Sequence, residues 1–230
     1  SRFTISLRLP SSSATPFAIC TNSGIQNPPL PSSTHRMRLS ATPAILSIVG
    51  LSLPEAIARL APEATPDAQA SIVQAYKDSF STRRAETVAP PYPGALAALD
   101  RLGARGDLLL GVATGKSRRG LDHVFATHGL AGRFVTHQVA DDHPSKPHPS
   151  MLLAALAETG AEARDAVMIG DTTFDIEMGR AAGLSTIGVT WGYHAPSALT
   201  AAGADLMIDS FDALPRLLRQ SGATVLYVTQ

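Results

Sequence analysis

The stretch from Ala166 to Trp191 constrains the fold of this chain more than any other part of the sequence. A short apolar run ends at Gly170-Asp171, and Asp175 follows four residues later. Beyond Asp175 the apolar positions have helical spacing up to the next glycine, after which a second apolar run begins. This order predicts a strand, an acidic loop, a helix and a second strand, which together form a parallel βαβ unit.

The acidic loop of this unit is a candidate metal site. Ligands of open parallel sheets bind beyond the carboxyl ends of the strands, where Asp171 is expected. Mg²⁺ in proteins is held by one or two carboxylates together with water and phosphate oxygens, so Asp171 and Asp175 suit it. The same two acids could instead cap the helix and face solvent. The loop by itself leaves both interpretations open.

Two more polar loops follow predicted strands, one with Thr114-Gly115-Lys116 and one with Lys146. In a parallel sheet these loops emerge at the same edge as Asp171. A hydroxyl and backbone amides at a helix start can hold phosphate oxygens, and an ammonium group can neutralise phosphate and a nearby carboxylate. Each residue alone could be an ordinary cap or a solvated side chain. Their combination at one edge predicts a site for phosphate and metal.

Periodicity along the chain predicts the fold class and the division into domains. Strands alternate with helices over residues 89–230, which is typical of a doubly wound parallel sheet in an α/β protein. The last predicted strand is 206–208 and the last predicted helix is 214–218. Two helices with no strand between them predict a small helical module over residues 48–88.

Composition excludes several classes of function. The net charge is zero and no basic stripe is present, which argues against a nucleic-acid partner. No apolar stretch reaches the roughly 18–20 residues needed to cross a membrane. The single cysteine, Cys20, rules out an internal disulfide framework and fits a reducing compartment, so we expect a cytoplasmic protein. A monomer is the default expectation, and a homodimer is possible.

The first 47 residues differ in composition from the rest of the chain. They are rich in Ser, Thr and Pro and contain no acid, because the first Glu is Glu55 and the first Asp is Asp67. Such a composition fits an organelle transit peptide or a disordered arm. We therefore treat residues 1–47 as an anomalous N-terminal tract, separate from the helical module and the α/β core.

Together the three loops resemble the motifs of the haloacid dehalogenase (HAD) hydrolase superfamily, and in particular its phosphoglycolate-phosphatase-like branch. The resemblance covers about residues 48–218. Three motifs carry it: Val112-Ala113-Thr114-Gly115-Lys116 as the second family motif, Ser145-Lys146-Pro147 as the third, and Gly170 to Asp175, in the form GDxxxD, as the fourth.

The resemblance implies a Rossmann-type core with a helical cap at residues 48–88. It also implies a Mg²⁺-dependent phosphatase that acts on a small phosphorylated metabolite through an aspartyl-phosphate. The site residues it implies are Thr114 and Lys146 for catalysis, Thr114, Gly115, Lys116 and Lys146 for substrate binding, and Asp171 and Asp175 for Mg²⁺.

The sequence departs from the family at the first motif, DxDGT, which should lie on a central strand before the cap and supply the nucleophile. No Asp precedes Asp67, so both catalytic aspartates are absent there. Residues 1–47 are then a misread or frameshifted stretch, an alternative start that gives an inactive ligand-binding relative, or a transit peptide. We favour the first explanation, because the core and cap motifs are otherwise intact. Carbon–halogen hydrolysis and phosphoglucomutase chemistry are the alternative reactions.

Overall fold

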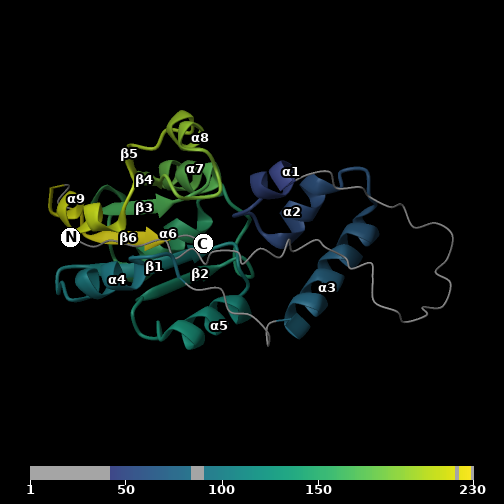
Figure 1. Ribbon diagram of the computed structural model, residues 1–230, viewed down its shortest axis with the longest axis horizontal. Helices are drawn as coiled ribbons and strands as arrows, with labels where there is room; N and C mark the ends of the chain where they lie inside the picture. The colour runs from purple at the N-terminus through teal and green to yellow at the C-terminus, as the bar shows by residue number, and fades with distance from the viewer. Residues whose placement is uncertain (1–41, 84–90, 221–222, 229–230) are drawn as a thin grey trace.

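The computed structural model describes residues 42–83, 91–220 and 223–228 of the chain. Its core is a parallel sheet of six described strands in the order β2-β1-β6-β3-β4-β5 (Figure 1). This arrangement confirms the predicted α/β class. The strands are β1 (Leu109–Thr114), β2 (Thr136–Val139), β3 (Ala166–Gly170), β4 (Ser185–Val189), β5 (Leu206–Ile208) and β6 (Val225–Val228).

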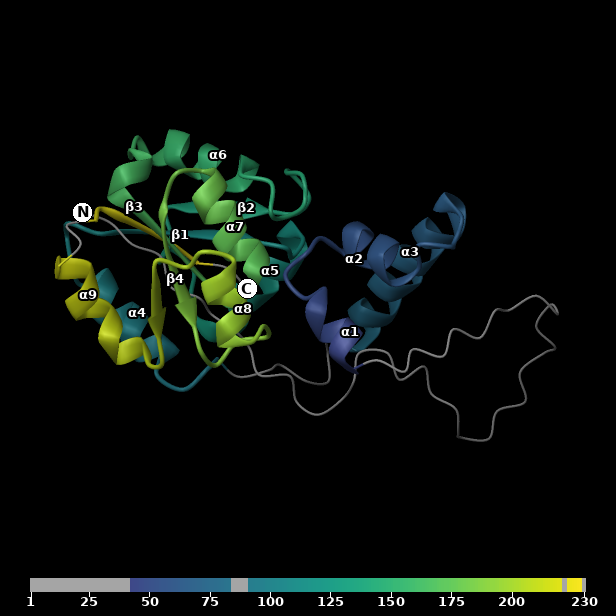
Figure 2. The ribbon, with the colours of Figure 1, turned by 90° about the horizontal axis from the view of Figure 1, so that it is seen from above.

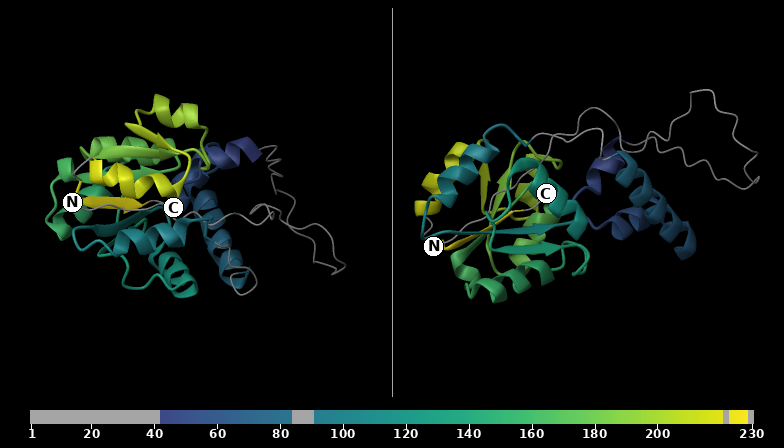
Figure 3. Two further views of the ribbon diagram at one scale, coloured as in Figure 1. Left: turned by 60° about the vertical axis from the view of Figure 1, so that its left-hand side comes forward. Right: turned by 90° about the horizontal axis from the view of Figure 1, so that it is seen from below.

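Helices cover both faces of the sheet, as Figures 2 and 3 show. Side chains of α4, α5 and α9 pack on one face, and side chains of α6 and α7 pack on the other. The described helices are α1 (Thr42–Ser47), α2 (Leu53–Leu60), α3 (Pro66–Arg83), α4 (Ala95–Gly103), α5 (Arg118–His128), α6 (Ser150–Thr159), α7 (Thr173–Ala181), α8 (Pro196–Ala201) and α9 (Leu214–Gln220), with short 3-10 turns at Ala163–Asp165 and Phe211–Ala213.

Alternation along β3 explains why the sheet is buried on both sides. Val167 and Ile169 face the α4, α5 and α9 layer, whereas Met168 faces α6 and α7. Each of these side chains is at most 2% exposed. A strand that is apolar on both faces suits only the inside of a doubly covered parallel sheet.

The centre of the sheet shows that one sequence prediction, the position of the last strand, is wrong. Residues 206–208 are not the last strand, because β6 follows α9 and lies between β1 and β3, parallel to both. Figure 1 shows this C-terminal strand inserted between strands that come much earlier in the chain. Leu226 faces one layer of helices and Tyr227 the other, and both are fully buried. Burial raises the pKa of Tyr227 to about 12.

Helices α1, α2 and α3 form a separate unit beside the carboxyl ends of the strands (Figures 1 and 2). Helix α1 begins at Thr42, so helical structure starts before the predicted boundary at residue 48. Phe174 of α7 packs against Leu51 and Ala56 of this unit. The guanidinium of Arg59 also lies 5.2 Å from the centre of the Phe174 ring. We call this helical unit the cap.

Several sequence predictions fall outside the described residues or differ from them. Most of the anomalous tract, residues 1–41, is outside the described part, and so are residues 84–90. β2 begins only at Thr136, after Val135, whose side chain is 54% exposed. No helix in the described ranges is both long enough and apolar enough to span a membrane.

Candidate phosphate and metal site

Asp175 is locked at the start of α7 by its neighbour Thr172. Its Oδ2 atom accepts hydrogen bonds from the Thr172 amide at 3.0 Å and the Thr172 hydroxyl at 2.7 Å. This pattern is a capping box, which satisfies backbone donors that the first turn of a helix leaves unpaired. Asp175 has no exposed surface, so its carboxylate is part of the interior of the protein.

Lys146 forms a buried ion pair with the same carboxylate. Its Nζ atom lies 2.8 Å from Asp175 Oδ1, and both side chains are fully buried. Lys146 precedes a cis peptide bond to Pro147 in the loop after β2. Two charges removed from water are tolerated only when each compensates the other. The structure thus brings together two of the residues that the sequence placed in one site.

Asp171 lies directly after β3, at the carboxyl end of the sheet. It is 3% exposed, and its Oδ2 atom accepts a hydrogen bond from the Tyr193 amide at 3.0 Å. Asp175 accepts hydrogen bonds from protein donors through both its oxygens. No group of three or more His, Cys, Asp or Glu side chains in the described ranges could hold a metal ion. The carboxylates of this site therefore suit Mg²⁺ only if water and phosphate oxygens supply most of its ligands, as is usual for Mg²⁺ in proteins.

Thr114 ends β1 and is completely buried. Its hydroxyl accepts a hydrogen bond from the Lys116 amide at 3.2 Å. The next helix, α5, begins after Ser117, whose side chain accepts from the Gly120 amide. Thr114, Gly115 and Lys116 therefore form a tight loop between a strand and a helix start, a location suited to binding phosphate oxygens.

One part of the site was missed by the sequence analysis, namely the segment at Gly50 and Leu51. A Cβ atom on Gly115 would lie 2.8 Å from the carbonyl oxygens of both residues, and one on Gly50 would lie 3.0 Å from Thr172 Oγ1. Gly50 has a φ of +102°, a conformation that glycine adopts readily. The segment thus crosses between the Thr114 loop and the start of α7. A glycine just before a predicted helix was the only sequence signal for it.

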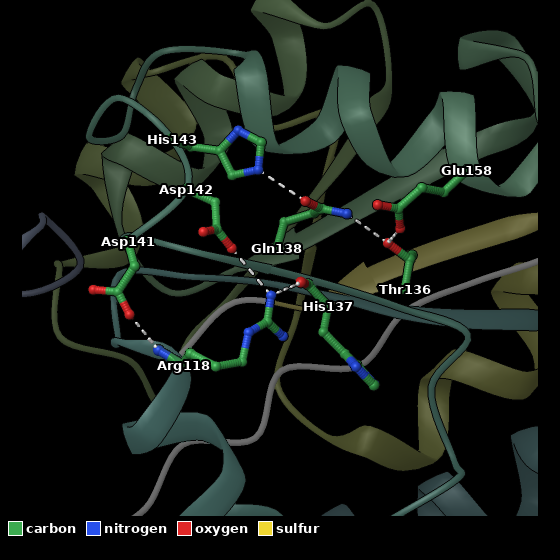
Figure 4. A network of polar contacts seen from close by, with 8 residues as sticks. All are labelled: Arg118, Thr136, His137, Gln138, Asp141, Asp142, His143 and Glu158. Atoms are coloured by element: carbon green, nitrogen blue, oxygen red, sulfur yellow. Dashed lines mark hydrogen bonds and ion pairs between the residues drawn. The ribbon is translucent and has the colours of Figure 1, made fainter.

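A polar network supports the loop that carries Lys146, as Figure 4 shows. His143 is bonded through Nε2 to Gln138 at 2.8 Å and through Nδ1 to the Ser150 hydroxyl at 2.9 Å. Gln138 in turn donates to Thr136, which donates to Glu158. The bond from Thr136 lowers the pKa of Glu158. Both ring nitrogens of His143 are therefore engaged by protein groups.

A second group of contacts in Figure 4 holds the beginning of the same loop. The Arg118 amide donates to Asp141 at 2.7 Å, and its guanidinium contacts Asp142 at 3.1 Å and the His137 carbonyl at 2.9 Å. Because Arg118 opens α5, these bonds tie the loop after β2 to the helix after β1. They fix two of the polar loops relative to each other.

The carboxyl end of the central strand differs from those on either side. β6 consists of Val225, Leu226, Tyr227 and Val228, none of which is acidic. Within the described residues, the strand between β1 and β3 therefore supplies no carboxylate to the site. Thr114 is the last residue of β1, and Asp171 directly follows β3. These two residues therefore flank the carboxyl end of β6.

Comparison with known proteins identifies the family to which this arrangement belongs. The model of the haloacid dehalogenase-like hydrolase family matches residues 35–189. The chain belongs to this family. A protein of Dickeya dadantii named "Probable phosphatase IndB" is 34% identical over 80% of this chain and 83% of its own length. A phosphoglycolate phosphatase of Cupriavidus necator is 35% identical over 70% of this chain and 68% of its own length.

Solved structures share the fold. A protein from Clostridium acetobutylicum, described as a predicted phosphatase, superposes with a TM-score of 0.68 at 24% identity and covers 77% of this chain and 81% of its own. At this level of identity the likeness concerns the fold alone. The predicted HAD-like core is confirmed, and the roles of the individual site residues stay predictions.

Proposed function

We propose that this HAD-family chain is a Mg²⁺-dependent phosphatase-type protein that recognises a small phosphorylated metabolite. The observation that carries the proposal is the buried pair of Lys146 and Asp175, at 2.8 Å, beside the ends of β1 and β3. A buried lysine held next to a carboxylate provides a fixed positive charge for phosphate oxygens. Relatives named as phosphatases support the same class of substrate.

Each site residue has a specific part in this proposal. Thr114 and the amides of Gly115 and Lys116 bind the phosphate, and Lys146 neutralises its charge. Asp171 holds Mg²⁺, which when bound adds Lewis-acid stabilisation of phosphoryl oxygens. Asp175 was expected to be a second direct ligand. Because both its oxygens accept bonds from Lys146 and Thr172, we assign it the positioning of Lys146.

A second candidate is a ligand-binding relative that does not turn over its ligand. The observation that favours it is the composition of β6, since none of its residues, Val225 to Val228, is an acid. Hydrolysis through an aspartyl-phosphate needs a carboxylate nucleophile in line with the phosphorus atom. The phosphate-binding groups Thr114 and Lys146 do not depend on that nucleophile, so binding is expected in either case.

Turnover and binding must therefore be measured separately. The purified chain is mixed with a panel of phosphate monoesters, with Mg²⁺ or with EDTA, and released phosphate is followed. Release that requires Mg²⁺ and is lost in Thr114→Val supports the phosphatase. Binding of the same esters without release selects the inactive relative. Absence of both contradicts the proposed function.

Two wider expectations belong to the same proposal. The single cysteine supports a reducing, cytoplasmic location, because such compartments do not maintain structural disulfides. Each chain carries Thr114, Lys146 and Asp171 together, so a monomer would hold all the phosphate-binding groups named here. Cell fractionation and sedimentation of the purified protein test these two points.

A further inference from the structure

His143 joins the two elements on either side of the loop that carries Lys146. On one side its Nε2 atom lies 2.8 Å from Oε1 of Gln138 in β2, a contact drawn in Figure 4. On the other side its Nδ1 atom lies 2.9 Å from Oγ of Ser150, the first residue of α6. Lys146 lies between these two attachments in the chain. A ring bonded at both sides restricts the conformations open to the loop.

The direction of these hydrogen bonds is set by Glu158, at the far end of the network in Figure 4. The bond from Thr136 lowers the pKa of Glu158, and an ionised carboxylate can only accept. Thr136 therefore uses its one hydroxyl hydrogen for Glu158. Its Oγ1 atom must then accept from the amide nitrogen of Gln138, 2.7 Å away. This leaves the carbonyl oxygen of Gln138 facing His143.

A neutral His143 ring has one arrangement that satisfies both of its neighbours. Because Gln138 Oε1 can only accept, His143 Nε2 carries the proton, and Nδ1 is the acceptor for the Ser150 hydroxyl. Every hydrogen bond from Ser150 to Glu158 thus points the same way. Thr136 is 2% exposed and Gln138 is 5% exposed, so water offers these two side chains few alternative partners. We call these five residues the His143 network.

The position of this loop determines where the charge of Lys146 lies. The Lys146 ammonium is fully buried and lies 2.8 Å from Asp175 Oδ1. A buried ion pair depends on accurate geometry, because neither charge has water as an alternative partner. Small displacements of groups that contact a substrate also reduce binding and catalysis strongly. A residue that fixes the loop therefore affects the phosphate site without touching the phosphate.

We propose that His143 is a positioning residue, which holds the loop after β2 so that Lys146 lies at the phosphate site. It does so as the Nε2-protonated tautomer, through hydrogen bonds directed from Ser150 toward Glu158. The inference rests on the proposed function, because it takes Lys146 as the group that neutralises the phosphate. His143 acts through the loop and needs no contact with the ligand.

Calorimetric binding of ethyl phosphate in Mg²⁺ to the full chain tests the positioning role. His143→Leu should weaken binding about tenfold, because two hydrogen bonds of ordinary strength are lost. His143→Gln offers an amide donor to Gln138 and a carbonyl acceptor to Ser150, so it should restore most of the affinity. His148→Leu is the control, because it makes the same change at an exposed histidine of the same loop, outside the His143 network. It should change the affinity about twofold or less.

¹⁵N NMR of the histidine rings tests the direction of the bonds without any ligand. At a pH above the ordinary histidine pKa of about 6.5, the His143 ring should carry its proton on Nε2. The chain has seven histidines, so the His143 signals are identified by their loss in His143→Gln. Glu158→Ala removes the acceptor that sets the direction, and the Nδ1-protonated form should appear. Glu162→Ala, at a side chain that is 63% exposed and outside the His143 network, should leave the spectrum unchanged.

The outcomes separate this inference from the proposed function. If His143→Leu lowers the melting temperature but binds ethyl phosphate as tightly as the natural chain, the phosphate site stands and the positioning role is overturned. Equal losses of affinity in His143→Leu and His148→Leu also overturn it. A proton on Nδ1 of His143 in the natural chain contradicts the directed network. If the natural chain does not bind ethyl phosphate, both the proposed function and the positioning role are wrong, whichever tautomer the spectrum shows.

Discussion

β3 and β6 are neighbours at the centre of the sheet, and their carboxyl ends differ. β3 leads into Asp171 and the capping box of Asp175, to which Lys146 is bound at 2.8 Å. β6 pairs with β3 in parallel, and Val225, Leu226 and Tyr227 are equally buried, but its described residues are all apolar or aromatic. β3 therefore leads into both packing and polar contacts, whereas the described residues of β6 contribute packing. Similar burial in a fold does not imply similar roles in the site.

The largest expected effect comes from breaking the ion pair between Lys146 and Asp175, near the carboxyl end of β3. Lys146→Ala leaves the Asp175 carboxylate buried without its cationic partner, which should cost about 3–5 kcal/mol of unfolding free energy in urea titrations. Arg164→Ala breaks an ion pair whose two side chains are 75% and 63% exposed, and it should cost about 0–1 kcal/mol. Equal losses in the two variants would show that the pair is solvated.

The packing role of β6 is tested by Leu226→Ala. This side chain is fully buried between the sheet and the α4, α5 and α9 layer, so its removal should cost about 2–5 kcal/mol. Leu153→Ala on α6 is the matched control, because Leu153 is 49% exposed and should lose far less. A loss for Leu226→Ala as small as that of the control would mean that β6 is not in the sheet.

These two strands also show how far the sequence predicts the fold. β3 was predictable because an apolar run, Gly170-Asp171 and a helical stripe follow one another within one local segment. β6 is a run of only four residues, and such short runs fit strands and helices alike. Its central place depends on pairing with β1 and β3, which are distant in the sequence.

The site was predictable to a similar extent. Parallel strands must deliver the Thr114, Lys146 and Asp171 loops to one edge, and the structure places them there. The different roles that we propose for Asp171 and Asp175 rest on the donors around each carboxylate, and spacing does not contain that information. The crossing of Gly50 depends on how the cap meets the core, again through contacts remote in sequence.

The segment at Gly50 and Leu51, which crosses between the Thr114 loop and the start of α7, provides the next prediction. In Gly50→Ala, the alanine would have a strained backbone φ of +102°, and its Cβ would lie 3.0 Å from Thr172 Oγ1. We expect a loss of about 1–3 kcal/mol in stability together with weaker phosphate binding. Gly132→Ala is the control, because its φ is +75° but no atom lies within 4 Å of the added carbon. Unchanged phosphate affinity in Gly50→Ala would place this segment outside the site.

The smallest expected effect is a change in how the stability of the protein depends on pH, through His137 in β2, the strand before the Lys146 loop. Burial, followed by the charge of Arg118, lowers the pKa of His137, so the folded protein favours the neutral ring. The contribution of His137 to stability is present above its unfolded pKa of about 6.5 and is lost as the pH falls below it. His137→Phe keeps the edge contact to Phe125 and should flatten this part of the stability curve. Parallel curves for both proteins would refute this.

The central claim is that the ends of β1 and β3 form a phosphate site with a divalent cation, whatever β6 supplies. The most direct measurement is calorimetric binding of ethyl phosphate in Mg²⁺ and in EDTA, for the natural chain and for Asp171→Asn. We predict that binding is clear in Mg²⁺, much weaker in EDTA, and equally weak in Asp171→Asn under both conditions. Binding that is insensitive to both EDTA and Asp171→Asn would contradict the claim.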